Sequence, residues 1–223
     1  LNTDWPLLSL TAEDFVREIL IKRIHPSYIV EGPNFGFGRD RKGNVETLTA
    51  MSSKGGYQVR IVEPYRIHLS DDEAIVISST AVRQLLLAGE VHKAAMCLGR
   101  PYRLIGTVVH GAAVGRKLGY PTLNLDVEGQ LVPAEGVYAG LVEVAGLRKA
   151  AAISIGRRPT LDGRDLVIEA HVIDETGDWY AERACLELVR RLRGQIRFAN
   201  REELTHQISV DIEQVREAVA AIR

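Results

Sequence analysis

The sequence has little cysteine and no cluster of histidines. Cys97 and Cys185 are its only cysteines among 223 residues, and both lie in apolar stretches. Two isolated thiols of this kind favour small buried side chains in a reducing compartment over a disulfide or a metal pair. The six histidines show no metal-ligand spacing, and only His171 falls close to the candidate chemistry.

An excess of charge of either sign is also lacking. The formal net charge is −1, which gives no argument for bulk attraction to nucleic acid or to an anionic membrane. There is no run of 18 apolar residues and no signal-peptide pattern at the N-terminus. We therefore expect a cytoplasmic protein that binds small molecules. The chain starts at Leu1 without a methionine, so we expect a piece of a longer protein.

The stretch GTVVHGAAVGRKLGYPTLNL, residues 106–125, combines glycines, cations and oxygen ligands. After an initial apolar run, its loop carries three spaced glycines and two adjacent cations: Gly111, Gly115, Gly119, Arg116 and Lys117. Glycines let a backbone approach a phosphate and leave N–H groups free to donate. Thr122 and Asn124 fall on one side of an extended segment, and their oxygens suit a magnesium ion that also holds phosphates. The stretch predicts a magnesium-nucleotide site, with an ordinary glycine-rich hairpin turn as the alternative.

The first hundred residues alternate helices and strands, which is typical of an α/β layer with a mostly parallel sheet. We expect a helix over residues 11–23 with Thr11 as its cap, followed by a short buried strand over residues 28–30. A helix over residues 45–54 and a strand over residues 57–62 follow. A further helix begins near Ser79 or Thr80, either of which is a plausible N-cap, and Arg83 projects from it. The N-terminus of such a helix is either simply capped, with Arg83 in solvent, or it binds an anion.

Gly99-Arg100-Pro101 marks a boundary, so we predict domains over residues 1–99 and 100–223. Beyond it, short apolar strands are expected near residues 102–110, 137–144, 149–155, 166–173 and 183–191. Hairpin signals at Ala145-Gly146 and Asp162-Gly163 favour a small antiparallel barrel. Asn200 and Glu203 form a capping-box pattern that opens a C-terminal helix, whose apolar face should pack on the barrel.

Several motifs in the second domain resemble those of riboflavin kinases. The glycine-rich stretch matches the family's ATP-binding pattern GxVxxGxxxGRxLGxPTxN. GVYA at residues 136–139, SIGRRPT at 154–160, EAHVID at 169–174 and GDWY at 177–180 are similar to the family's GVYA, NIGxxPT, ExHxxD and GDLYG segments. Ser154, Trp179 and Ala181 depart from the usual residues. The resemblance covers about residues 100–219 and implies a small barrel that transfers the ATP γ-phosphoryl group to riboflavin.

The same resemblance implies a role for each matching residue. Thr122 and Asn124 would hold Mg²⁺, and Glu169 would be the general base. Gly111 and Arg116 would cover the phosphates as a mobile flap. Asp174 and Tyr180 would lie near the nucleotide, and Arg193 and Phe198 would line the flavin ring. From the alternation of side chains along a strand alone, Glu169 could equally well face solvent. Arg193 and Phe198 could instead pack at the edge of the barrel.

The first domain resembles part of an FMN adenylyltransferase domain. ISSTAVR is similar to the ISSTxIR phosphate motif, which makes Ser79, Thr80 and Arg83 its remnant. GPNFGFGRDRKGN resembles GxDFRFGxxRxG, with departures at Asn34 and Gly36. The histidine motif Gly-x-Phe-Asp-Gly-x-His-x-Gly-His has no counterpart. Together the two parts resemble the bacterial bifunctional FAD synthetases, and we expect FMN formation here and FAD formation only in a longer parent. A non-catalytic flavin- or nucleotide-binding module is the alternative.

Overall fold

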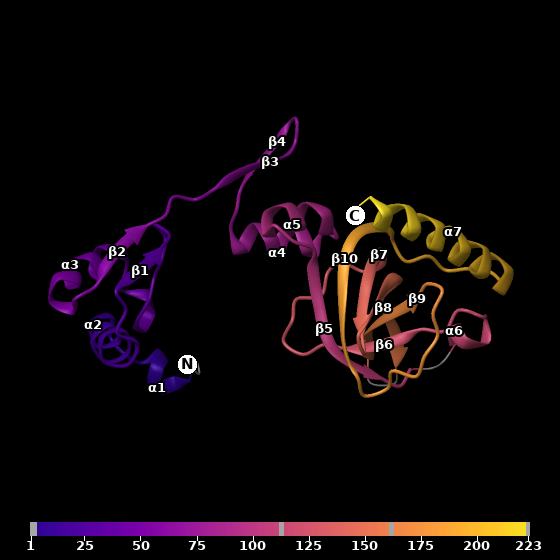
Figure 1. Cartoon of the computed structure of the whole chain (residues 1–223), viewed down its shortest axis with the longest axis horizontal. Coiled ribbons are helices and arrows are strands. Elements are labelled where there is room, and N and C mark those ends of the chain that lie inside the picture. Colours follow the sequence, from indigo (N-terminus) through magenta and orange to yellow (C-terminus); the bar gives the residue numbers. More distant parts are fainter. Residues whose placement is uncertain (1–3, 112–113, 161–162, 222–223) are drawn as a thin grey trace. The chain divides into compact units, whose positions relative to one another are not determined.

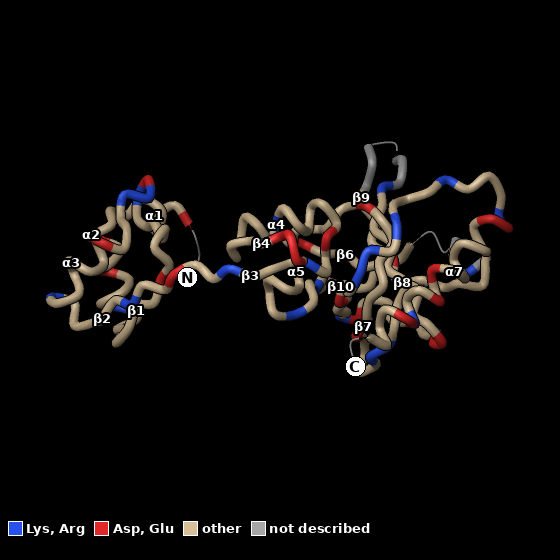
Figure 2. Tube along the Cα trace, turned by 90° about the horizontal axis from the view of Figure 1, so that it is seen from above, with Lys and Arg blue, Asp and Glu red and all other residues tan. Residues whose placement is uncertain are grey.

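The computed structural model describes residues 4–111, 114–160 and 163–221, so Asp162 of the second expected hairpin signal lies outside the described residues. The chain divides into two compact units, Leu1–Arg66 and Ile67–Arg223 (Figure 1). Each unit has its own buried apolar cluster. Acidic and basic residues occur along both units rather than separating between them (Figure 2).

The first unit is a small α/β layer. Its elements are α1 (Trp5–Leu8), α2 (Ala12–Asp14), the π-helix η1 (Phe15–Ile24), β1 (Tyr28–Glu31), the 3₁₀ turn η2 (Arg39–Arg41), α3 (Val45–Gly55) and β2 (Gln58–Ile61). β1 and β2 pair in parallel, as the alternation of helices and strands predicted. Their pairing orders a core in which Val16, Leu48 and Tyr57 are buried, with the Tyr57 hydroxyl donating to the Leu48 carbonyl at 2.9 Å.

Two local expectations in this unit have different outcomes. Thr11 caps the first long helix, since its Oγ1 accepts from the Asp14 N–H at 3.1 Å. The expectation of a buried strand at residues 28–30 is wrong, because Tyr28 and Val30 are 63% and 55% exposed. This apolar run forms a strand of a two-stranded sheet. One face of so small a sheet has little to pack against, so its side chains stay exposed.

The second unit begins with a hairpin and two helices. β3 (Arg66–Ser70) and β4 (Glu73–Val76) pair in a hairpin that the sequence did not indicate, and α4 (Ser79–Leu87) and α5 (Val91–Leu98) follow. The N-cap of α4 is Ser78, whose Oγ accepts from Ala81 N–H at 3.1 Å, so the expected cap at Ser79 or Thr80 is wrong by one residue or two.

The two helices pack with the barrel core. Leu86 of α4 and Val91 and Ala94 of α5 belong to one buried cluster with Leu104 of the first barrel strand. Packing therefore divides the chain between Arg66 and Ile67, whereas the predicted division at residues 99 and 100 follows the motifs. The division at residues 99 and 100 stays a prediction, because it rests on sequence motifs and not on packing.

The rest of the second unit is a closed antiparallel barrel with a C-terminal helix, as expected. Its strands are β5 (Tyr102–Val109), β6 (Leu123–Asp126), β7 (Gly136–Val144), β8 (Leu147–Thr160), β9 (Gly163–Val172) and β10 (Arg183–Arg193), and their order around the barrel is β10-β5-β6-β9-β8-β7. The short helix α6 (Val114–Lys117) follows β5 and precedes β6 in the chain, and it lies at the side of the barrel (Figure 1). Ala145 and Gly146 form the β7–β8 turn with φ values of 49° and 78°, as the hairpin signal predicted.

The helix α7 (Arg201–Ala220) covers part of the outer face of the barrel. Asn200 caps it by accepting from Glu203 N–H at 2.8 Å. Val215 is fully buried and Ala218 and Val219 nearly so against Ala139 and Ile173 of the barrel. This helix fixes the segment that connects it to β10, which matters for the site.

An ion-pair network ties three barrel strands together on the same outer surface. Glu187 of β10 is 5% exposed and accepts hydrogen bonds from Arg103 of β5 and Arg148 of β8. Burial by itself would raise the pKa of the Glu187 carboxyl, but the hydrogen bonds from Arg148 and Arg103 outweigh burial and lower this pKa. Glu187 is therefore ionised in the folded protein at neutral pH.

Candidate functional site

The predicted magnesium-nucleotide residues meet at one cavity of about 650 Å³. Of the predicted residues, five line it: Gly111, Arg116, Thr122, Asn124 and Tyr180. They come from the end of β5, from α6, from the start of β6 and from the turn before β10. The size lies in the range of small-molecule sites. Residues far apart in sequence are thus assembled at one end of the barrel.

A histidine holds the Pro121-Thr122 segment in this wall. The Nδ1 atom of His171 on β9 lies 2.8 Å from the Pro121 carbonyl oxygen, and a hydrogen bond here requires that Nδ1 carry the proton. The Tyr120 ring packs edge-on against the His171 ring at 5.5 Å between centroids. The hydroxyl of Thr122 is thereby carried on a segment that is bound to the sheet next to it.

Glycine is required at residue 111 by a close approach to Asn124. A Cβ atom at Gly111 would lie 2.1 Å from Nδ2 and 2.6 Å from Oδ1 of Asn124, which leaves no room for a side chain. Asn124 is 8% exposed, so its amide is held between the backbone at Gly111 and the sheet. Gly115 similarly approaches the Tyr120 carbonyl, and a side chain at residue 115 would not fit between them. The glycines thus allow the α6 segment to close onto the start of β6.

A group of aromatic rings in the wall of this cavity was not foreseen in full. His110 stacks on Tyr180 with 3.7 Å between ring centroids and 14° between planes, and both line the cavity together with Trp179. The expectation that only His171 lies near the chemistry is therefore wrong. His110 directly precedes Gly111, so its place in the glycine-rich stretch was the available signal. The stacking partner is separated from it by about seventy residues, and only the fold brings them together.

The donors at this cavity fit a magnesium ion shared with a phosphate chain. Thr122 offers a hydroxyl oxygen and Asn124 an amide oxygen, both on the cavity wall. Over the described part of the chain, no group of three or more His, Cys, Asp or Glu side chains is placed to hold a metal. A protein that supplies few hard oxygens suits Mg²⁺, which keeps water and substrate phosphates as its other ligands.

Glu169 does not line this cavity but is the direct neighbour of a residue that does. In the antiparallel pairing of β6 and β9, Asn124 lies opposite Glu169, and in that of β8 and β9, Ser154 lies opposite Glu169 on its other side. Opposite residues project to the same face of a sheet, with Cβ atoms about 4.5–5.5 Å apart. Glu169 lines a second cavity, of about 370 Å³, together with Ser154 and residues 195–197. The two cavities thus have adjoining walls at Asn124 and Glu169.

Asp174 lines neither of these two cavities. Its carboxylate accepts two hydrogen bonds of 2.8 Å from the guanidinium of Arg216 on α7. These bonds lower the pKa of the Asp174 carboxyl. Asp174 has a φ of 57°, so it occupies a turn directly after β9. The structure does not bring it to the predicted nucleotide site, where Glu175 and Asp178 lie instead.

Arg193 and Phe198 likewise do not line the cavity that contains Glu169. The Arg193 guanidinium is paired with Asp211 of α7, and its Cζ lies 5.9 Å from the centre of the Phe198 ring. The intervening residues Gln195 and Arg197 do line that cavity. In the segment that resembles the flavin-binding motif, the residues that line the cavity are therefore not the two predicted ones.

The remnant of the phosphate motif lies on α4. Ser79, Thr80 and Arg83 are all exposed, and none lines either of the two cavities. Among the described residues, no helix is both long enough and apolar enough to cross a membrane.

Comparison with known protein families gives two matches along the chain. The family model described as riboflavin kinase matches residues 98–219, more than half of the chain. The model described as FAD synthetase matches residues 2–81. The two matches follow each other in the order that the motifs indicated.

Comparison with individual proteins gives relatives of the same kind. A bifunctional riboflavin kinase/FMN adenylyltransferase of Haemophilus influenzae is 34% identical over 206 residues, covering 92% of this chain and 65% of the relative. The proteins of that description from Escherichia coli K12 and Pseudomonas fluorescens are also 34% identical, and the chain covers 66% and 68% of them. The chain thus spans about two thirds of the length of these curated relatives.

A solved structure shares the fold. It is a crystal structure of a Streptococcus pneumoniae protein described as a macrolide-efflux protein, 34% identical, with a TM-score of 0.81. The similarity covers 97% of this chain and 68% of the other.

Proposed function

This chain belongs to the riboflavin kinase family, within the bifunctional riboflavin kinase/FMN adenylyltransferase proteins, and from this membership we propose that its barrel phosphorylates riboflavin. The reaction moves the γ-phosphoryl group of ATP to the ribityl 5′-hydroxyl of riboflavin and yields FMN and ADP. Phosphoryl transfer asks a protein mainly for positioning and charge stabilisation, which the two adjoining cavities are suited to supply.

One observation carries the proposal: Asn124, which lines the first cavity, lies opposite Glu169, which lines the second, in the pairing of β6 and β9. ATP in the 650 Å³ cavity would bring its phosphates to Thr122 and Asn124. Riboflavin in the 370 Å³ cavity would bring its ribityl end to Glu169. Because Asn124 and Glu169 are opposite each other in the sheet, the donor and acceptor would meet across neighbouring strands.

Each wall residue then has a task on chemical grounds. Arg116 in the cavity wall offers a guanidinium for the phosphate chain, and Gly111, which lines the same cavity without a side chain, would let its backbone N–H donate to the phosphates. The stacked rings of His110 and Tyr180 offer a flat surface for the purine. Glu169 takes the proton from the ribityl hydroxyl, a contribution of roughly 10²–10⁴ in rate.

Thr122 and Asn124 would hold Mg²⁺, with which ATP enters the cavity. When bound, the ion neutralises charge on the phosphate oxygens. Thr122 is kept in place by the contact between Pro121 and His171, and Asn124 by its burial against Gly111. The protein's own contribution is therefore a pair of oxygens in the wall of the cavity, carried on backbone that is held by the sheet.

We propose further that these 223 residues by themselves do not adenylylate FMN. The sequence contains no Gly-x-Phe-Asp-Gly-x-His-x-Gly-His motif, and the exposed Ser79, Thr80 and Arg83 line neither cavity. Transfer of an adenylyl group needs positive groups around the α-phosphate, which an isolated phosphate motif does not supply.

The test is an assay of the purified chain with ATP, Mg²⁺ and riboflavin, with the flavins separated by chromatography. The proposal expects FMN and no FAD, and no FMN after chelation of the metal. A folded chain that quenches riboflavin fluorescence without forming FMN would be a binding module instead. FAD formation from added FMN would overturn the statement on adenylylation alone.

A further inference from the structure

The residues that connect β10 to α7 form one wall of the cavity that contains Glu169. Gln195, Ile196 and Arg197 line this cavity from one side, while Ser154 and Glu169 line it from the sheet. The connecting residues, 194–200, have no helix or strand structure of their own. Their position must therefore come from side-chain contacts at fixed points.

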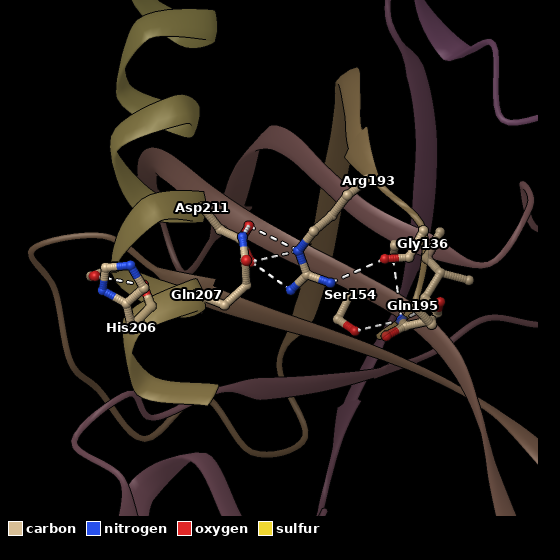
Figure 3. A network of polar contacts seen from close by, with 10 residues as sticks. Gly136, Ser154, Arg193, Gln195, His206, Gln207 and Asp211 are labelled. Atoms are coloured by element: carbon tan, nitrogen blue, oxygen red, sulfur yellow. Dashed lines mark hydrogen bonds and ion pairs between the residues drawn. The ribbon is translucent and has the colours of Figure 1, made fainter. Parts of the chain in front are cut away.

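The first fixed point is the ion pair between Arg193 and Asp211. Nε of Arg193 donates to Oδ1 of Asp211 at 2.9 Å, and Nη2 donates to Oδ2 at 2.7 Å. Gln207, one turn earlier on α7, donates to Oδ1 at 2.9 Å (Figure 3). The two charged side chains are 17% and 4% exposed. Asp211 is thus fully engaged and lies between the helix and the end of β10.

The second fixed point is Gln195. Its side-chain amide donates to the Ser154 hydroxyl at 3.1 Å and to the Ile155 carbonyl at 2.8 Å (Figure 3). Ser154 is the residue opposite Glu169 in the sheet. The wall is therefore attached on one side to α7 and on the other to the strand position next to the candidate base.

A buried ion pair is a weak source of stability, because removing both charges from water costs about as much as their attraction returns. What such a pair does supply is a single geometry, since a bidentate guanidinium–carboxylate contact fixes both partners in angle and distance. Neither Arg193 nor Asp211 lines the cavity of Glu169. A contact of this kind directly before a wall without regular structure is suited to setting the position of that wall.

We propose that Asp211 is a positioning residue for the flavin side of the reaction, acting through Arg193 on residues 195–197. The inference rests on the proposed riboflavin kinase function. It differs from the role that motif similarity implies for Arg193, because here the guanidinium shapes the wall from behind rather than touching the flavin. A consequence is that Arg193 and Asp211 act as one unit.

The test is a double-mutant cycle with Asp211→Asn, Arg193→Ala and the double variant, measuring the riboflavin Kd by fluorescence quenching and KM for riboflavin and for ATP. Each single variant is expected to raise the riboflavin Kd and KM by roughly fivefold or more, with KM for ATP unchanged within about twofold. The double variant is expected to match the single variants, because both remove the same contact. Glu217→Gln, an exposed carboxylate on the same helix, is the matched control.

Two results would overturn the inference. One is a folded Asp211→Asn protein with wild-type riboflavin Kd and KM. The other is a double variant whose loss is the product of the two single losses, which would show Arg193 acting on the flavin directly. If Asp211→Asn does not fold, Gln195→Ala and Gln207→Leu test the two fixed points separately, and wild-type riboflavin affinity in both would overturn it as well. An absence of FMN from the wild-type chain would reject the proposed function, while the Kd values would still test the wall.

Discussion

Asn124 on β6 and Glu169 on β9 are opposite partners in antiparallel strands, so their side chains project from the same face of the barrel. Asn124 faces the cavity that also contains Thr122 and Arg116, and Glu169 faces the cavity bounded by residues 195–197. An amide oxygen and a carboxylate are thereby held side by side by backbone pairing. The sheet register, rather than a flexible loop, sets the separation between the two halves of the proposed reaction.

Glu169→Gln should lower kcat by tenfold or more, within the roughly 10²–10⁴ range of general-base contributions, because an amide cannot accept the ribityl proton. The dissociation constant of a non-hydrolysable ATP analogue should stay close to that of the wild type, since Glu169 lies outside the ATP cavity. Glu143→Gln, which removes an exposed carboxylate on β7, is the control. Wild-type turnover in Glu169→Gln would remove this residue from the role of base.

Thr122→Val should raise the Mg²⁺ concentration needed for half-maximal rate by roughly tenfold, because it removes one oxygen ligand and keeps the shape of the side chain. KM for riboflavin should not change. A Mg²⁺ titration at saturating ATP measures the effect, and Thr107→Val on β5, outside this cavity, is the control. An unchanged Mg²⁺ requirement would leave Thr122 without a metal role.

Gly111→Ala should weaken ATP binding by roughly tenfold, equivalent to about 1.4 kcal/mol. The added Cβ atom would lie 2.1 Å from the Asn124 amide nitrogen, so either the Asn124 side chain or the backbone at residue 111 must move. Titration with an ATP analogue measures the loss. At Gly32 an added Cβ meets nothing within 4 Å, so Gly32→Ala should bind ATP as the wild type does.

Glu187→Gln should destabilise the barrel by about 2 kcal/mol at pH 7, because it removes the charge that accepts from Arg103 and Arg148. The folded-state pKa of Glu187 lies below its unfolded value, so this stability is present above the unfolded pKa of about 4.3 and is lost as the pH falls through the folded pKa. The difference between wild type and Glu187→Gln should therefore be full at pH 6–8 and shrink below about pH 4.

Urea unfolding measures this difference at each pH. Trp179 packs against the barrel core, whereas Trp5 lies in the first unit and is 80% exposed. A Trp5→Phe background therefore restricts the fluorescence signal to the barrel. A gap between the two proteins that is equally large at pH 3 and pH 7 would contradict the assignment of the lowered pKa to Glu187.

The sequence by itself determined the elements whose signals are local. The caps at Thr11 and Asn200, the Ala145-Gly146 turn, the parallel pairing in the first unit and the barrel after residue 100 follow from short-range patterns and were found as predicted. The motif around Gly111 and Thr122 was equally readable, because its residues are close in the chain.

Which distant residues meet is set by the three-dimensional fold. The fold paired Asp174 with Arg216 and Arg193 with Asp211, stacked His110 on Tyr180, and packed α4 and α5 against the barrel. It also left Tyr28 and Val30 exposed on a two-stranded sheet. The contacts within the second unit depend on strand register and on the order of strands around the barrel. Local patterns do not encode those quantities, because a residue's partner across a sheet is set by the closure of the whole barrel.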